Sequence, residues 1–330
     1  MLCGACIALP TLAFTQEAEV AGTPIPLRIA AGPASEPMFA AAGIVANIVS
    51  NPPGGPACPA SAICGPPGVV GEARSTASAI ANIESLATGE NETAFVEGDV
   101  LWQAYNGFGR FAGKPLGDLR ALSVLYTKTV FLIVRAGGGI PDIAGLRRKT
   151  VALGDLDDPH FHIVSAILGQ HGVRERDLTL VHLGTDSAAS ALAHGEVDAA
   201  IMVAPTLPQA FRDIAERLPL RLLPVETGAV QALLRQQPYL IEVEIGDLAE
   251  GRRRTSGLAL PVLWVTTQRL PPQIGYGLIR SLQAPANQEA MAQALPQGSA
   301  IAAREELTRS PIPLHIGAAR WSEEASGVVR

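Results

Sequence analysis

The chain has 330 residues, of which 48% are hydrophobic and 17% are charged, and its formal net charge is −6. This composition is typical of a compact globular protein and excludes a disordered one. The net negative charge and the lack of a basic stripe argue against nucleic acid as a partner. The length suits two domains, each large enough to bury a core of its own.

The amino-terminal residues predict export. Residues 1–15 carry no charge and are mostly small or apolar, which suits the apolar region of a secretory signal. We therefore predict that residues 1–20 form a signal segment and that the mature protein is periplasmic. No apolar run in the sequence reaches the ~18 residues that a membrane span needs.

The cysteines fit this prediction. Cys3 and Cys6 lie in the predicted signal segment, which leaves Cys58 and Cys64 in the mature chain. These two lie close together in a segment rich in Pro and Gly, which is too irregular for a metal site and easily closed as a small loop. We predict a disulfide between them, as an oxidising compartment allows, and two free buried thiols are the alternative.

The mature chain alternates short apolar runs with helical patterns. The first half predicts a strand over 27–31, a helix over 38–49, a loop over 51–71, a helix over 76–86, a strand over 93–96, a helix over 100–105 and an extended run over 119–135. The second half predicts helices over 140–148, 161–170, 187–194, 207–218 and 227–236, and strands over 150–153, 178–183, 198–203, 220–225, 239–245 and 258–266. The remainder is mainly helical.

This alternation predicts an α/β protein with mostly parallel sheets and flanking helices. Two long extended runs, around 122–135 and 239–266, bracket a middle block of the chain. A two-lobed protein needs such runs, because its chain leaves one lobe, builds the second and returns. We predict that lobe 1 contains residues 25–130 and 250–330 and that lobe 2 contains residues 131–249. Ligands of such sheets bind at the carboxyl ends of the strands, where helix N-termini converge.

Several strings along the chain match a known family in their order and spacing. They are Cys64-Gly65-Pro66-Pro67-Gly68, Ser78-Ala79-Ile80-Ala81-Asn82, Glu97-Gly98-Asp99-Val100, Ala104-Tyr105-Asn106-Gly107, Leu119-Arg120-Ala121-Leu122, Leu125-Tyr126, Gly195-Glu196-Val197-Asp198-Ala199 and Ile312-Pro313-Leu314-His315-Ile316-Gly317-Ala318. From about residue 27 to 327 the chain resembles the TAXI family of solute receptors for TRAP transporters.

The resemblance implies a type II periplasmic-binding-protein fold with a ligand cleft between its two lobes. It also implies a small organic solute as ligand, an organic acid or an amino-acid-like molecule. The receptor would deliver this solute to the membrane subunits of a TRAP transporter. The family uses no catalytic residue and no cofactor, so the resemblance implies a protein that is not an enzyme.

The first predicted cleft loop covers residues 32–39. Ser35 and Glu36 stand where the family usually has glycines, and Phe39 stands where it has a tyrosine. We predict that these three residues contact the ligand. The alternative is that Ser35 caps the following helix and that Phe39 belongs to the core.

The second loop contributes Ser78 and Asn82. The amide of Asn82 can both accept and donate hydrogen bonds, as a group that orients a ligand must. We predict that Asn82 binds the ligand, and its alternative is a surface amide. Ser78 is either a ligand contact or a helix cap.

The third loop has Glu97 and Asp99 where the family has a Gln-Ser-Asp string. Glu97, at the end of a predicted strand, is the stronger ligand candidate. Asp99 is a second candidate, although its position favours capping of the helix that begins at Val100.

The fourth loop, residues 154–162, departs furthest from the family, which has a Gly-Ser-Gly-Thr string there that can hold a carboxylate. Asp158 followed by Pro159 predicts a helix start with the acid at the cap. We predict that Asp157, Asp158 and His160 line the cleft. The cluster from Asp155 to His162 also invites a metal site, which is the less favoured reading.

Three functions follow from these residues. The leading one is a transport receptor, and the second is a sensor or scaffold that keeps the fold. The third, which is less favoured, is a metal-dependent enzyme built on the cluster from Asp155 to His162. Because Glu36, Glu97 and the Asp157-Asp158 pair replace neutral groups, we also expect a ligand that is cationic, rich in donors or less anionic than glutamate.

Overall fold

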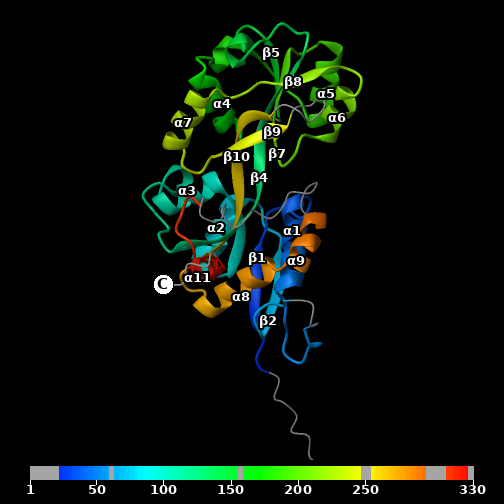
Figure 1. Ribbon diagram of the computed structural model, residues 1–330. Helices are drawn as coiled ribbons and strands as arrows, with labels where there is room; N and C mark the ends of the chain where they lie inside the picture. The colour runs from blue at the N-terminus through cyan, green and yellow to red at the C-terminus, as the bar shows by residue number, and fades with distance from the viewer. Residues whose placement is uncertain (1–21, 59–62, 155–158, 247–253, 295–309, 326–330) are drawn as a thin grey trace, which may run out of the picture.

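The computed structural model describes residues 22–58, 63–154, 159–246, 254–294 and 310–325. It shows two lobes joined by two long strands (Figure 1). The predicted signal segment, residues 1–20, lies outside the described residues. No helix within the described ranges combines the length and the hydropathy of a bilayer span.

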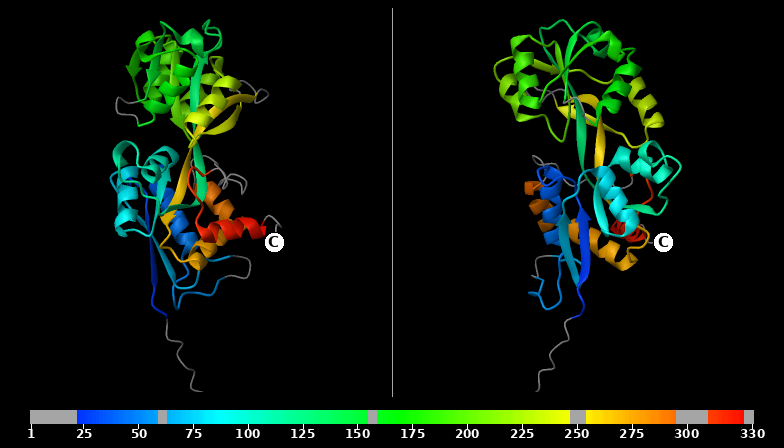
Figure 2. Two further views of the ribbon diagram at one scale, coloured as in Figure 1. Left: turned by 90° about the vertical axis from the view of Figure 1, so that its left-hand side faces the viewer. Right: turned by 180° about the vertical axis from the view of Figure 1, so that it is seen from behind.

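Lobe 1 holds both ends of the described chain, and Figure 2 shows it from two further sides. Its elements are β1 (Ile25–Ala30), α1 (Pro37–Val49), β2 (Val69–Arg74), α2 (Ala79–Thr88), β3 (Thr93–Glu97), α3 (Gly98–Asn106), the 3-10 helix η1 (Gly109–Phe111), α8 (Pro272–Leu282), α9 (Pro285–Ala294) and α11 (Ile316–Ala325).

Lobe 2 is built from the middle of the chain. Its elements are the 3-10 helix η2 (Ile143–Leu146), β5 (Thr150–Leu153), α4 (Phe161–Gln170), the 3-10 helix η3 (Glu175–Asp177), β6 (Thr179–His182), α5 (Thr185–His194), β7 (Ala199–Ala204), α6 (Gln209–Ala215), β8 (Leu220–Leu222), α7 (Thr227–Gln236) and β9 (Ile241–Gly246).

The strands β4 (Leu119–Arg135) and β10 (Arg254–Thr267) pass through both lobes. In lobe 1 they pair with each other, and β10 also pairs with β3. From Thr129 onward β4 pairs with β7, while β10 pairs with β9 up to Ala259. Thr129 and Ala259 face each other in register, so both strands change partners at one level. The extended run around 122–135 is therefore confirmed as part of β4. The run around 239–266 holds two strands, β9 and β10, which pair antiparallel with each other, and only β10 crosses between the lobes. The lobe limits given above stay a prediction.

The strands form one mixed sheet of ten strands in the order β2-β1-β3-β10-β4-β7-β5-β6, with β8 beside β4 and β9 beside β10. The outer strands of each lobe pair in parallel, as expected. β4 and β10 pair antiparallel with every neighbour, so the sheet is not mostly parallel. The reason is that β4 enters lobe 2 against the direction of its strands, and β10 returns against β4.

Helices cover both faces of each half of the sheet. In lobe 1, α1 and α8 pack over one apolar cluster, and α2 and α3 pack over another. In lobe 2, α4 and α7 cover one face and α5 and α6 the other. Trp264 of β10 and Phe95 of β3 are fully buried, with their rings edge to face and 6.4 Å apart. Each lobe therefore has its own core, which fixes the loops at its inner end.

One predicted helix is replaced by a tighter turn. The helix expected over 140–148 is a single 3-10 turn, in which the Asp142 side chain accepts a hydrogen bond from the Gly145 amide at 2.8 Å. Arg148 then takes a positive φ of 62°, which ends the turn. Pro141 and Gly145 account for the difference, because both residues disfavour a longer α-helix.

The predicted disulfide is confirmed. Cys58 and Cys64 are bonded, with their Cα atoms 5.9 Å apart, in the loop that precedes β2. The bond precedes the first residue of β2, Val69, whereas the cleft loop follows the last residue of that strand, Arg74.

We expect removal of this bond to lower the free energy of unfolding by about 2 kcal/mol, since it closes only a short loop. The measurement is urea unfolding of a Cys58→Ser/Cys64→Ser variant. A reductant should lower the stability of the wild type to the same value and leave the variant unchanged. A variant as stable as the oxidised wild type would contradict the expectation.

Candidate ligand cleft between the lobes

A cavity of about 670 Å³ is lined by residues of both lobes. Lobe 1 contributes the loops that follow β1, β2 and β3, and lobe 2 contributes the segments before α4 and after β7. The crossing strand β4 contributes Tyr126 and Lys128. The strands β1, β3 and β7 all end at this level, because the parallel strands of each lobe point toward the other lobe. The volume is in the range typical of small-molecule sites.

Glu97 is the centre of a charged cluster in this cleft. It is the last residue of β3 and is 7% exposed. Its Oε1 accepts a hydrogen bond from Nζ of Lys128 and lies 3.2 Å from Nε2 of His160. Lys128 belongs to β4, and His160 stands just before α4 in lobe 2. The cluster therefore joins three segments and both lobes.

The surroundings of Glu97 keep its carboxyl group ionised. Burial is the largest influence and by itself would raise the pKa. The hydrogen bond with His160 and the charge of Lys128 together outweigh burial and hold the pKa of Glu97 at about 2. Glu97 is thus a carboxylate at any physiological pH, and its charge is balanced by Lys128.

A second pair joins the lobes beside the first. Asp99, in the first turn of α3, is 4% exposed, and its Oδ2 lies 3.3 Å from Nε2 of His162 in α4. The hydrogen bond to Asp99 raises the pKa of His162 against the opposing effect of burial. One turn further along α3, the rings of Trp102 and Tyr239 lie 5.9 Å apart. The start of α3 therefore contacts lobe 2 through the Glu97–His160 hydrogen bond, the Asp99–His162 pair and an aromatic pair.

Tyr126 offers a neutral polar group to the cleft. It lines the cavity and is 3% exposed. Burial, followed by the negative charges of Glu97 and Glu36, raises the pKa of the phenol above its ordinary value. Within the described part of the chain its hydroxyl group makes no hydrogen bond, so it is available to a ligand as a donor and an acceptor.

The model of the NMT1-like family matches residues 29–325 of the chain. The chain belongs to the NMT1-like family. The TAXI family implied by the sequence strings is a narrower assignment, and it stays a prediction.

Two solved structures are similar to the chain. A TctC solute-binding protein from Polaromonas is 15% identical to the chain, with a TM-score of 0.56, covering 92% of this chain and 98% of that one. The periplasmic sulfonate-binding protein SsuA from Methylobacillus flagellatus is also 15% identical, with a TM-score of 0.49, covering 93% of this chain and 88% of that one. The likeness to the TctC protein confirms the two-lobed periplasmic-binding-protein fold.

Five of the predicted site residues line the cleft, namely Glu36, Ser78, Asn82, Glu97 and His160. Their roles differ. The Ser78 hydroxyl caps α2 by accepting a hydrogen bond from the Ala81 amide at 3.3 Å. Glu36 is exposed, and its side chain makes no hydrogen bond or ion pair with the described residues. Glu97 and His160 form the charged cluster.

Asn82 lies in the wall of the cleft, but its amide is engaged at both ends. Its Oδ1 accepts a hydrogen bond from Thr76, and its Nδ2 donates to the carbonyl oxygen of Phe95 at 2.8 Å. The residue is fully buried. Asn82 thus ties the loop before α2 to β3, which differs from the ligand-orienting role expected for it.

Two other candidates in lobe 1 lie outside the cleft lining. The helix α1 begins at Pro37 with Glu36 at its N-cap position and with no side-chain cap, so Ser35 does not have the capping role considered for it. Ser35 is exposed beside the cleft. Phe39 is half-buried and packs on the core of lobe 1, which is the alternative considered above.

The candidates at the starts of α3 and α4 need correction. The helix α3 begins at Gly98, so Asp99 lies inside its first turn and does not cap it. Its carboxylate faces His162 of lobe 2, since both residues lie on the faces that the lobes present to each other. The helix α4 begins at Phe161 with His160 at its N-cap position, and Pro159 precedes it. Asp157 and Asp158 lie outside the described residues.

Lys128 and Tyr126 line the cleft and were not among the residues that the sequence predicted for it. Both lie inside the extended run over 119–135, which reads as a buried strand. The available signal was Lys128 itself, because a lysine in the middle of an apolar strand needs a partner charge.

Within the described ranges, no group of three His, Cys, Asp or Glu side chains is arranged to hold a metal ion. The acidic residues of the metal alternative, Asp155, Asp157 and Asp158, fall outside those ranges.

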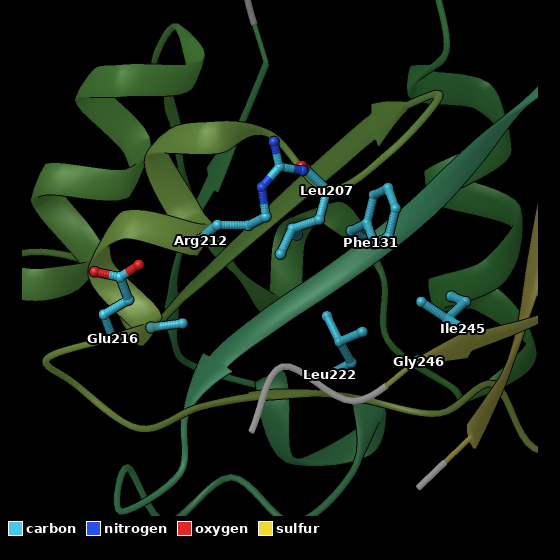
Figure 3. A pocket seen from close by; sticks show the side chains of 8 residues that line it. Phe131, Leu207, Arg212, Glu216, Leu222, Ile245 and Gly246 are labelled. Atoms are coloured by element: carbon cyan, nitrogen blue, oxygen red, sulfur yellow. The ribbon is translucent and has the colours of Figure 1, made fainter. Parts of the chain in front are cut away.

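A second cavity, of about 450 Å³, is lined by lobe 2 alone (Figure 3). Phe131, Leu222 and Ile245 give it apolar walls, and Arg212 of α6 and Glu216, which follows that helix, contribute charged groups. The Arg212 guanidinium donates to the carbonyl oxygen of Leu207 at 2.6 Å. None of the predicted site residues lines this cavity.

The pair of His162 and Asp99 should make stability depend on pH. Because the folded state holds the proton of His162 more tightly than the unfolded state, its contribution is fully present below about pH 6.5 and disappears as pH rises through the raised pKa. We expect the loss of unfolding free energy in a His162→Gln variant to be largest at acidic pH and to vanish at alkaline pH.

Urea unfolding at several pH values measures this difference. In an Asp99→Asn background the substitution of His162 should lose its pH dependence. A difference that stays constant from acidic to alkaline pH would show that the pair does not bind a proton on folding.

Proposed function

We propose that the chain is an extracytoplasmic receptor that captures a small organic solute between its lobes and delivers it to a membrane transporter. The observation that carries this proposal is the cleft between the lobes, where side chains from both lobes and from β4 converge. Because β4 and β10 join the lobes, bending of these strands can close the cleft around a solute. The fold shared with a solute-binding protein supports the same function.

Within this function we assign the chain to the TAXI receptors of TRAP transporters, with the TRAP membrane subunits as its partners. The ordered strings from residue 27 to 327 support this narrower assignment. The confirmed disulfide supports a periplasmic location, because such bonds persist in oxidising compartments. The uncharged stretch over residues 1–15 supports export from the cytoplasm, because it resembles the apolar region of a secretory signal.

Solute binding should raise the thermal midpoint of the protein and close the lobes. A ligand at 100 times its Kd adds about 2.7 kcal/mol of stability. A thermal-shift screen of small organic solutes finds the ligand, and small-angle X-ray scattering then measures the decrease in radius of gyration. No shift and no compaction with any solute would contradict the receptor function.

The hydroxyl group of Tyr126 should contribute to that affinity. We expect a Tyr126→Phe variant to bind the solute about three- to tenfold more weakly, which corresponds to one hydrogen bond. The matched control is Tyr276→Phe, which removes an exposed hydroxyl group that contacts Glu324 on the surface of lobe 1. Equal affinities of the two variants would place the ligand away from Tyr126.

The TRAP assignment predicts transport driven by an ion gradient. Proteoliposomes that contain TRAP membrane subunits from the same genome should take up the solute only when the receptor is added. Uptake should need a sodium or proton gradient and no ATP. Uptake that depends on ATP would assign the receptor to an ABC transporter instead.

A further inference from the structure

The charged cluster of Glu97, Lys128 and His160 holds a carboxylate that belongs to the protein. We propose that Glu97 occupies the place of a ligand's acidic group, so that the cleft selects polar solutes that are uncharged or cationic and disfavours dicarboxylates. This inference rests on the proposed function, because it takes the cleft between the lobes as the solute site.

The groups around Glu97 would form an anion site without it. Lys128 and His160 are the basic side chains among the described residues that line the cavity. The helices α3 and α4 begin beside them, and among the described residues neither has a side-chain cap on its first amides. Amide groups at the starts of helices attract anions, as do a lysine and a protonated histidine.

The carboxylate of Glu97 already satisfies these groups. It accepts a hydrogen bond from Lys128, contacts His160 at 3.2 Å, and its side chain is 9% exposed. The charges of Glu97 and Lys128 sum to zero. A ligand carboxylate that approached Lys128 would therefore compete with a buried, preorganised carboxylate of the protein and would lie next to its negative charge.

A second carboxylate makes the cleft more negative. Glu36 lines the cavity from the start of α1, and its side chain has no partner among the described residues. The negative charges of Glu36 and Glu97 both act on the hydroxyl group of Tyr126, which places that hydroxyl within the field of both. An anionic ligand at Tyr126 would meet the same two charges.

The polar groups left for a ligand fit an uncharged or cationic molecule. The buried hydroxyl group of Tyr126 has no partner in the described ranges and can bind an amide, a carbonyl or a hydroxyl group. Lys128 retains two ammonium protons for a neutral acceptor. Glu36 can accept hydrogen bonds from an amide or an ammonium group. Together these groups favour a solute with donors at one end and a neutral acceptor at the other.

The test uses succinate and succinamide, which have similar shapes and differ in charge. The variant Glu97→Gln keeps the shape of the side chain and removes its charge, which leaves the charge of Lys128 for a ligand anion. We expect its affinity for succinate, measured by calorimetry, to rise at least about tenfold over the wild type. Its affinity for succinamide should change little. Adding Lys128→Met to the variant should abolish the gain.

The matched control is Glu92→Gln. Glu92 is also paired with a cation, since Nε of Arg28 donates to its Oε2 at 3.0 Å, but it lies outside the cleft lining. This control changes the net charge by the same amount and should leave succinate binding unchanged. If Glu97→Gln does not fold, Glu36→Gln serves in its place, because Glu36 is exposed. It should give a smaller gain in succinate affinity.

The inference is wrong if the wild type binds succinate as tightly as the folded Glu97 or Glu36 variant, or if succinate binds to neither. The experiments distinguish failure of this inference from failure of the receptor function. A wild type that binds and closes on some solute, with no gain of succinate binding in the variants, would overturn the inference alone. A gain in the variants, with no solute for the wild type in a broad screen, would overturn the receptor function alone.

Discussion

The burial of one carboxylate constrains the centre of this molecule. Removing Glu97 from water is costly unless partner groups replace the water, and Lys128 and His160 are those partners. They come from β4 and from lobe 2, so the arrangement needs both lobes and a crossing strand in register. The position of His160 depends on the start of α4, and that of Lys128 depends on the pairing of β4 with β10. The contacts of Glu97 with Lys128 and His160 thus form only when both lobes and β4 are in this arrangement.

The pairing of the crossing strands β4 and β10 contains two register shifts next to the cleft. β4 and β10 shift register between Val262 and Leu263 and again between Trp264 and Val265. Each shift leaves an extra residue on β4, Leu125 and Leu122 respectively, and an extra residue reverses the face to which the following side chains point. Tyr126 follows directly after the first of these, and Lys128 lies two positions further on. The two reversals cancel, so the side chains of Tyr126 and Lys128 lie on the face of β4 that uninterrupted alternation from Leu119 would give them.

The distance along the chain between interacting residues explains what the sequence could and could not predict. Features set by neighbouring residues were predicted well, such as the strand over 119–135 and the disulfide at Cys58. Features set by contacts between distant segments were not. Asp99 has the spacing of a helix cap, but His162 of the other lobe takes its carboxylate. The contact of Lys128 with Glu97 joins two strands that are distant in the sequence, which no pattern of apolar residues shows.

The segment that contains Leu314 and His315 holds the first part of β4 in place within lobe 1. Leu314 bridges to Ala121 of β4, and Nε2 of His315 lies 2.9 Å from the carbonyl oxygen of Leu270. A side chain at Gly275 would come within 2.2 Å of His315, so the glycine is needed for the histidine to enter. The segment thus fixes β4 within lobe 1. At the level of Thr129 and Ala259 the crossing strands exchange partners. Lys128 lies one residue before that level, so the Glu97–Lys128 pair belongs to the part of β4 that is held within lobe 1, and His160 reaches this pair from lobe 2.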